Sequence, residues 1–425
     1  MKKVIIFTHT QFSHIASSIN LAKMLSQNKF KVYLYCGNYF KNFVEEQNIE
    51  NDNLTIKYYK ESLHSQIKLI KKDYDKYVGG IGLDREISSI KSIKKEIHEM
   101  AEFILRVSNV YKEALLDEIK YINPDLIIRD TCSLFGRMIG EALSIPVYGY
   151  ATSTIVTDDC KEIDKKNFLE LIYNIKLDCY GNDEINELYK YIKQDYHELS
   201  KKYNVSDIPI NYLLNPGEKI NFCYGMPFFD HTPKNYIYLK PTLFEKGSME
   251  VNCHKNRNMV YVSSGSTISF PARVYNSIIN CATKSLEKYV ISFKYSNVDF
   301  VKIKNLPENV LIQPFVNQKE VLNTSKLFIS HGGFNSLIES IYFEVPLFII
   351  PICSDQFLNA FFVKKKGLGT SLSWHDIHNS GSINKLIESI DYSKCLRNIL
   401  EVKCQINSLP DMGYLLEIIK KDLSE

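Results

Sequence analysis

Short apolar runs of strand length alternate with segments of helical periodicity along the chain. The periodicity is clear over 14–27, where Ile15, Ile19, Ala22 and Leu25 share one face of the expected helix. Such alternation is typical of parallel sheets covered by helices, so we expect an α/β protein. Strands are expected at 4–8, 31–37, 54–59, 125–130, 146–150, 219–224 and 236–239, and then at 259–264, 289–293, 310–313, 327–330 and 347–351.

The alternation stops at a proline-containing segment and then begins again. A linker near 240–256 is therefore the expected boundary between two doubly wound domains, an N-terminal one over 1–240 and a C-terminal one over 241–410. A last helix within 411–425 is expected to pack back on the N-terminal domain. The other long helices are expected at 86–121, 166–176, 183–203, 271–287, 334–343, 355–365 and 383–407, with loops and a short helix over 61–84.

Composition narrows the class of protein. The 425 residues are 45% hydrophobic and 24% charged with a net charge of +3, so no clustered basic face for nucleic acid is expected. The apolar run at the start is too short and too polar for a signal peptide, and no run approaches the roughly 18–20 apolar residues of a membrane span. The ten cysteines form no C-x-x-C pair, so neither a zinc site nor a redox pair is expected. We expect a cytoplasmic protein.

The most informative stretch is 327-LFISHGGFNSLIESIYFEVPLFIIPICSDQFLNA-360. A buried strand ends in His331-Gly-Gly333 and a helix begins near Asn335, which together predict an anion site suited to phosphate. Glu339 lies one helical turn after Ser336, where a carboxylate could accept hydrogen bonds from a ribose. The same two residues also have the spacing of a capping box, which would be purely structural.

Neighbouring motifs strengthen the functional interpretation. The order Phe315-Val316-Asn317-Gln318, then H-x-G-x-x-S-x-x-E, then Glu344-Val345-Pro346, then Asp355-Gln356 resembles that of inverting nucleotide-sugar glycosyltransferases. This family includes the UDP-glycosyltransferases and the bacterial macrolide glycosyltransferases. The resemblance implies the GT-B fold, with two Rossmann-like domains facing across a cleft.

The resemblance also implies roles for individual residues in binding the donor. Phe315, which stands where many members have Trp, is expected to stack on the base. Val316 is expected to contact the base through its backbone. Gln318 and Glu339 are expected to bind the ribose, and Asp355 and Gln356 to bind hydroxyls of the transferred sugar. The residues expected at the diphosphate are His331, Gly333, Asn335 and Ser336. A loop in 260-VYVSSGST-267 resembles a second phosphate contact and adds Ser266 and Thr267. Because Asn317 replaces a proline, the choice of nucleobase stays open.

Inverting transfer needs a base that takes the proton from the acceptor hydroxyl. His14 follows the first strand, and Asp130 ends the strand 125-DLIIRD-130, so both lie at carboxyl ends of strands, where ligands bind. They resemble the catalytic dyad of the family, in which the carboxylate orients the imidazole. The structural alternatives are a polar helix start for His14 and a helix cap for Asp130, and His9 is the competing base.

We therefore expect a metal-independent inverting glycosyltransferase without a cofactor. It would move a hexose from a nucleotide diphosphate, UDP-glucose or a close relative, to a small aromatic or polyketide-like acceptor bound by 60–85 and 151–215. The oligomeric state is expected to be a monomer or a homodimer. The alternatives are an inactive homologue that acts as a partner protein, a GT-B epimerase, and a lipid-linked cell-wall transferase that uses the basic stretch 68–77 at a membrane.

Overall fold

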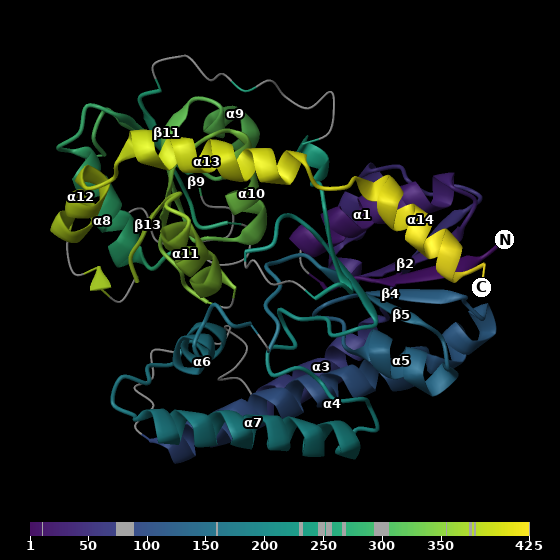
Figure 1. Cartoon of the computed structure of the whole chain (residues 1–425). Helices are drawn as coiled ribbons and strands as arrows, with labels where there is room; N and C mark the ends of the chain where they lie inside the picture. Colours follow the sequence, from purple (N-terminus) through teal and green to yellow (C-terminus); the bar gives the residue numbers. More distant parts are fainter. Residues whose placement is uncertain are drawn as a thin grey trace. The chain divides into compact units, whose positions relative to one another are not determined.

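The computed structural model describes residues 1–10, 12–73, 89–158, 160–228, 233–244, 251, 257–265, 269–292, 306–353, 355–373, 376–377 and 380–424. The chain divides into two compact units, Met1–Leu239 with Pro410–Glu425, and Lys240–Leu409. Figure 1 shows a sheet flanked by helices in each unit. The predicted α/β class with two Rossmann-like domains is thereby confirmed.

The first unit contains a parallel sheet in the order β3-β2-β1-β4-β5-β6-β7. The order reverses between β1 and β4, which pair directly, so the carboxyl ends of these two strands flank the point where open α/β sheets bind ligands. The strands are β1 Lys3–Phe7, β2 Lys31–Cys36, β3 Leu54–Tyr58, β4 Leu126–Asp130, β5 Val147–Ala151, β6 Ile220–Tyr224 and β7 Tyr236–Leu239.

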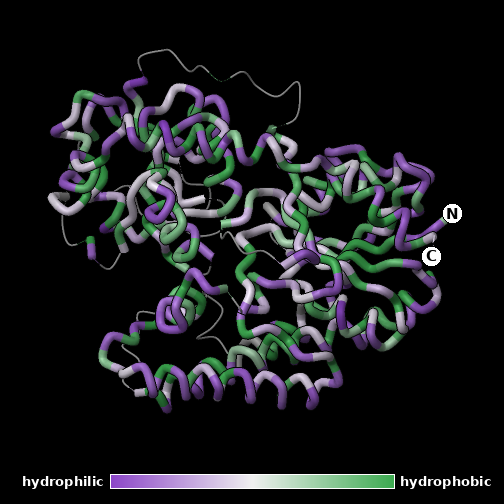
Figure 2. The backbone as a smooth tube through the Cα atoms, in the orientation of Figure 1, coloured by the Kyte–Doolittle hydropathy of each residue, from purple (hydrophilic) through white to green (hydrophobic). Residues whose placement is uncertain are grey.

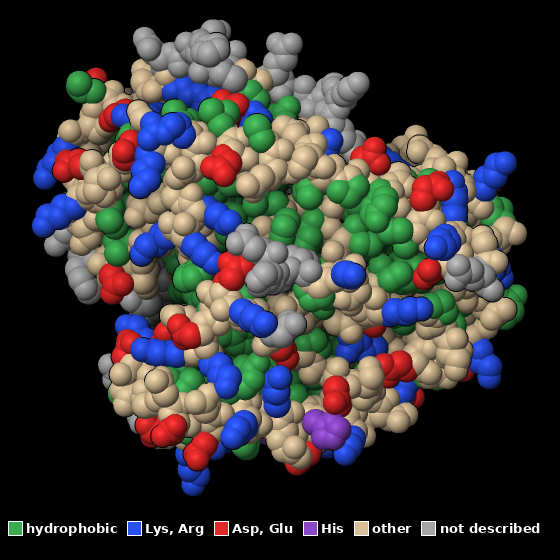
Figure 3. All heavy atoms as spheres, in the orientation of Figure 1, with side chains coloured by type: hydrophobic (Ala, Val, Ile, Leu, Met, Phe, Trp, Pro, Cys, Tyr) green, Lys and Arg blue, Asp and Glu red, His purple; other side chains and the backbone are tan. Residues whose placement is uncertain are grey.

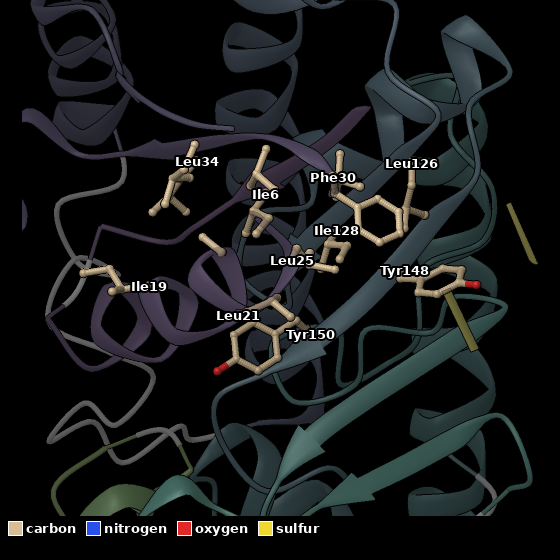
Figure 4. Packing of buried hydrophobic residues seen from close by; sticks show 14 of the residues in the cluster. Ile6, Ile19, Leu21, Leu25, Phe30, Leu34, Leu126, Ile128, Tyr148 and Tyr150 are labelled. Atoms are coloured by element: carbon tan, nitrogen blue, oxygen red, sulfur yellow. The ribbon is translucent and has the colours of Figure 1, made fainter. Parts of the chain in front are cut away.

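Helices cover both faces of this sheet because alternate strand residues point to opposite sides. Ile6 and Ile128 face α1, as Figure 4 shows, and belong to the same core cluster as residues of the C-terminal helix α14. Ile5 and Ile127 instead face α3, α4 and α5. Figure 2 shows the strands as mostly hydrophobic stretches, as expected of a sheet buried on both faces. The helices are α1 Phe12–Gln27, α2 Lys41–Glu46, α3 Glu61–Asp73, α4 Ile90–Ile122, α5 Phe135–Leu143, α6 Lys165–Tyr173, α7 Asn182–Lys202 and α14 Met412–Asp422.

The helix α4, with 33 residues, shows how local sequence sets an element. The Ser89 side chain accepts a hydrogen bond from the Ser92 backbone N–H at the start, and Asn123 adopts a left-handed conformation at the end. Buried residues recur at helical spacing between these caps, from Ile93 and Ile97 to Ile119. The expected start at 86 lies outside the described residues.

The second unit contains a parallel sheet in the order β10-β9-β8-β11-β12-β13. Its core includes residues of β8, β9, β11 and β12 packed against α8. The strands are β8 Met259–Ser263, β9 Lys288–Ser292, β10 Val310–Gln313, β11 Ser325–Ser330, β12 Leu347–Ile349 and β13 Gly369–Ser371. The helices are α8 Ala272–Ala282, α9 Gln318–Leu322, α10 Phe334–Tyr342, α11 Gln356–Lys365, α12 Ser380–Glu388 and α13 Tyr392–Asn407.

One predicted helix of this unit is wrong. The single helix expected over 383–407 is two helices, because Asp391 begins a new one: its side chain accepts a hydrogen bond from the Lys394 backbone N–H. A carboxylate in this position stabilises a helix start and not a helix interior. The strand β13 was not expected, since three residues are too few to form a recognisable apolar run.

The surface follows the composition. Lys and Arg side chains are interspersed with Asp and Glu on the face shown in Figure 3. Among the helices that the structure describes, none combines the length and the apolar character needed to cross a membrane.

Candidate active site

The first unit brings His14 and Asp130 into contact. His14 lies in the first turn of α1, directly after β1, and Asp130 is the last residue of the neighbouring strand β4. The two side chains are 116 positions apart in the chain, yet Nδ1 of His14 lies 2.7 Å from Oδ2 of Asp130. The Asp130 side chain is fully buried, whereas that of His14 is 13% exposed. The imidazole is therefore held by a buried carboxylate and still reaches solvent.

Several groups keep Asp130 ionised. Burial alone would raise the pKa of Asp130, but His14, His9 and a backbone N–H outweigh burial and hold this pKa below its usual value. That N–H belongs to Cys132 and donates to Oδ1 of Asp130 over 2.9 Å. The helix-cap alternative is wrong for α5, because the residue before its first turn is Leu134.

Two further residues at this site were not found from the sequence. Thr152, just after β5, places its Oγ1 2.8 Å from Nδ1 and 3.2 Å from Nε2 of His14. Cys132 contributes the backbone contact described above, and its thiol lies beside the dyad. The competing base His9 is close by, with its ring centroid 5.3 Å from that of His14. Single hydroxyls and thiols in loops give no periodic signal, so the sequence alone could not identify Thr152 and Cys132.

The second unit places His331 directly after β11, where the sequence predicts an anion site. The ring lies against two glycines: a Cβ added to Gly265 would be 2.4 Å from Cε1 of His331, and one added to Gly333 would be 2.6 Å from Nε2. Gly265 also has a φ of +84°, a conformation that residues with a Cβ rarely adopt. Burial lowers the pKa of His331 to about 4, so the imidazole is neutral near pH 7. Its Nδ1 is buried and has no hydrogen-bond partner among the described residues.

The N-terminus of α10 begins immediately after this histidine. Its N-cap is Gly333, which has no side chain to cap the first turn. The capping-box alternative for Ser336 and Glu339 is therefore wrong, because both lie inside the helix. Asn335 is exposed at the start of the same helix. The uncapped first turn leaves backbone N–H groups and the positive end of the helix dipole available for an anion.

A polar network joins four elements of the second unit, α9, α10, β8 and β9. Nε2 of Gln318, at the start of α9, donates to Oε2 of Glu339 over 2.6 Å and lies 3.3 Å from Oγ of Ser336. The hydroxyl of Tyr261, on β8, donates to Oε1 of Gln318 over 3.2 Å and lies 2.9 Å from Oγ of Ser292. Burial raises the pKa of Glu339, and its contacts with Gln318 oppose this shift.

The network brings together the two residues expected at the ribose. It also adds Tyr261 and Ser292, which sequence reasoning missed because a tyrosine inside an apolar strand looks like core. The amide orientation of Gln318 is defined, with its oxygen towards Tyr261 and its nitrogen towards Glu339. One carboxylate oxygen of Glu339 consequently has no role in this contact.

The remaining predicted donor residues differ in their surroundings. Phe315 exposes 71% of its surface, and Val316, beside it, is partly buried. Asp355 is the N-cap of α11. Gln356 is buried, and its Oε1 accepts hydrogen bonds from the backbone N–H groups of Ile352 and Cys353 at 2.8 and 3.1 Å. The amide oxygen of Gln356 therefore holds its own loop.

The predicted second phosphate contact cannot be placed in this way. Ser266 and Thr267 lie outside the described residues. They stay predictions from the sequence.

Comparison with known proteins shows similarity in sequence and in fold. Residues 240–405 match the family described as UDP-glucoronosyl and UDP-glucosyl transferase. A relative from Bacillus subtilis (strain 168), the "Uncharacterized UDP-glucosyltransferase YojK", is 23% identical over 77% of this chain and 81% of its own length.

Solved structures share the fold. The calicheamicin glycosyltransferase CalG4 has a TM-score of 0.71 at 16% identity and covers 100% of this chain and 99% of its own. The spinosyn rhamnosyltransferase SpnG, complexed with thymidine diphosphate, has a TM-score of 0.65 at 13% identity and covers 99% of this chain and 100% of its own.

Proposed function

We propose that this chain, which belongs to the UDP-glycosyltransferase family and is a nucleotide-sugar-dependent glycosyltransferase, transfers a hexose from a UDP-hexose with inversion. The acceptor would be a hydroxyl of a small aromatic or polyketide-like molecule. The observation that carries the reaction type is the 2.7 Å contact between His14 and the buried Asp130.

His14 is proposed as the general base. With its Nδ1–H donated to Asp130, the neutral ring keeps a lone pair on Nε2, which takes the proton from the acceptor hydroxyl as oxygen attacks the anomeric carbon. The carboxylate of Asp130 then stabilises the imidazolium that forms. Asp130 is thus a positioning residue, and its lowered pKa keeps it charged for this role.

The second unit is proposed to bind the nucleotide and to stabilise the leaving diphosphate. The N–H groups at the start of α10 and a neutral His331 offer hydrogen bonds to the developing negative charge, so the protein does the work of a cation. The carboxylate of Glu339, with one oxygen engaged by Gln318, offers its other oxygen to the ribose hydroxyls. The exposed ring of Phe315 is proposed to stack on the base.

The preference for the nucleotide is tested by competition calorimetry with UDP, dTDP, UDP-glucose and a dTDP-deoxysugar. We expect UDP and UDP-glucose to bind more tightly, because a 2′-hydroxyl gives Glu339 a donor that deoxyribose lacks. The matched variant is Glu339→Gln, which should bring the two nucleotides closer in affinity. A clear preference of the unaltered chain for the dTDP-deoxysugar would contradict the proposed donor.

The main competing function is that of an inactive homologue which serves as a partner protein. The intact dyad argues against it, because a partly exposed histidine held by a fully buried carboxylate is the arrangement that a general base requires. Slow hydrolysis of bound UDP-glucose, measured as release of UDP, distinguishes an active transferase from an inactive homologue. We expect hydrolysis in the unaltered chain and a strong loss in His14→Ala; equal rates in both would favour the inactive homologue.

A further inference from the structure

A metal-ligating set surrounds the proposed base. His14, Asp130 and Cys132 each offer one ligand atom, and these three atoms lie within 4.8 Å of one another. Among the described residues, these three are the ones whose ligand atoms lie this close together. The arrangement comes from the fold, because His14 follows β1 while the other two residues follow the neighbouring strand β4.

The loop after β4 makes the set compact. The Cys132 backbone N–H donates to Oδ1 of Asp130, which turns the chain back on itself and places the thiol near the carboxylate. The Asp130 side chain is fully buried and closes the inner end of the set. His14 and Cys132 are partly exposed, so an ion from solvent reaches the set from their side.

The donor chemistry selects the ion. Zinc binds imidazole nitrogen, thiolate sulfur and carboxylate oxygen, and sites with three protein ligands keep a fourth position for water. Magnesium and calcium prefer six or more oxygen ligands, and here one carboxylate faces one sulfur and one nitrogen. A carboxylate and a thiolate also balance the double charge of the zinc ion.

We propose that His14, Asp130 and Cys132 form an inhibitory site for Zn²⁺. On binding, the Cys132 thiol releases its proton to solvent and its sulfur bonds to the metal, as do one oxygen of Asp130 and one nitrogen of His14. If that nitrogen is Nδ1, its proton moves to Nε2; if it is Nε2, its lone pair is taken by the metal. In both cases Nε2 no longer accepts a proton, so transfer stops. The inhibition rests on the proposed function, whereas metal binding does not.

The binding test uses the full chain and zinc chloride alone, titrated against a chromophoric chelator. We expect one zinc ion per chain, and Cys132→Ser should weaken its binding by more than about tenfold, since even outer-shell partners of a metal cost 10–100-fold. The matched control is Cys179→Ser, which changes an exposed cysteine elsewhere and should bind zinc like the unaltered chain. Cobalt should give a thiolate-to-metal absorption band that Cys132→Ser lacks.

The activity test compares each variant with its own metal-free rate. Zinc should inhibit the unaltered chain and Cys179→Ser, a chelator should restore both, and Cys132→Ser should resist the same zinc concentration. The proposal is overturned if the unaltered chain binds no zinc, if Cys132→Ser binds it equally well, or if bound zinc leaves turnover intact. A chain that binds zinc through Cys132 but transfers no sugar would keep the metal site and refute the proposed function.

Discussion

Replacing Asp130 by Asn tests whether turnover depends on which ring nitrogen of His14 carries the proton. The change keeps the shape of a side chain that is fully buried. In the new amide, the oxygen must face the Cys132 backbone N–H, which donates to Oδ1 over 2.9 Å, because an NH₂ group there would face another donor. The NH₂ group therefore takes the place of Oδ2 and faces Nδ1 of His14, 2.7 Å away.

That orientation removes the base without removing the histidine. Nδ1 must accept the hydrogen bond from the amide, so the single proton of the neutral ring moves to Nε2, the atom that has to accept the acceptor's proton. We expect turnover to fall by about 10²–10⁴-fold, the typical value of general base catalysis. This corresponds to roughly 2.7–5.4 kcal/mol in the activation free energy. His14→Ala should fall by a similar factor.

The assay is a double-mutant cycle on turnover, with UDP affinity measured in parallel. Once His14 is replaced, Asp130→Asn should cost only a few-fold more, because residues that act as one unit are strongly non-additive. UDP affinity should hardly change, since the groups proposed to bind it lie in the other unit. The matched control is Asp125→Asn on the same segment, where the carboxylate contacts Lys2 and Lys3; its turnover should stay normal. Additive losses, or an Asp130→Asn variant with turnover close to normal, would refute this reasoning.

Four further predictions follow from the same structure. EDTA should leave the transfer rate nearly unchanged, because protein donors stabilise the diphosphate; a loss restored by magnesium or manganese would contradict this. Tyr261→Phe removes the hydrogen bond that orients Gln318, so calorimetry should show a smaller preference for UDP over its 2′-deoxy analogue, whereas equal weakening of both would indicate a merely structural tyrosine. Burial lowers the pKa of His331 to about 4 from 6.5, so the unfolded chain takes up a proton between these values that the folded chain does not. The free energy of unfolding should therefore fall as the pH drops from 6.5 to 4, and less steeply in His331→Gln; urea midpoints at pH 7, 5.5 and 4.5 with the same slope in both would refute this. Gly265→Ala, at a φ of +84° and against the His331 ring, should lose about 1–2 kcal/mol of stability from its backbone alone and also bind UDP more weakly. Gly181→Ala, where the nearest atom to an added Cβ is 3.8 Å away, is the control, and equal urea midpoints and UDP affinities in the two variants would count against the steric argument.

The sequence by itself determined the architecture and the position of the donor motif. Apolar runs predict strands because a strand buried on both faces must be apolar, and this property is local. The HGG stretch predicts the uncapped start of α10 in the same way, since glycines, strand end and helix start are consecutive in the chain. The break at Asp391 was a local signal as well, but apolar periodicity on both sides concealed it.

The tertiary structure decided which distant side chains meet. His14 and Asp130 touch because β1 and β4 are neighbours in the sheet, and strand order is not encoded in either segment alone. The same pairing adds Thr152 from the end of β5 and the thiol of Cys132, neither of which had a motif. The pKa of His331 likewise depends on burial by several segments. Contacts of this kind arise from packing between elements, so their chemistry exists only once the sheets have formed.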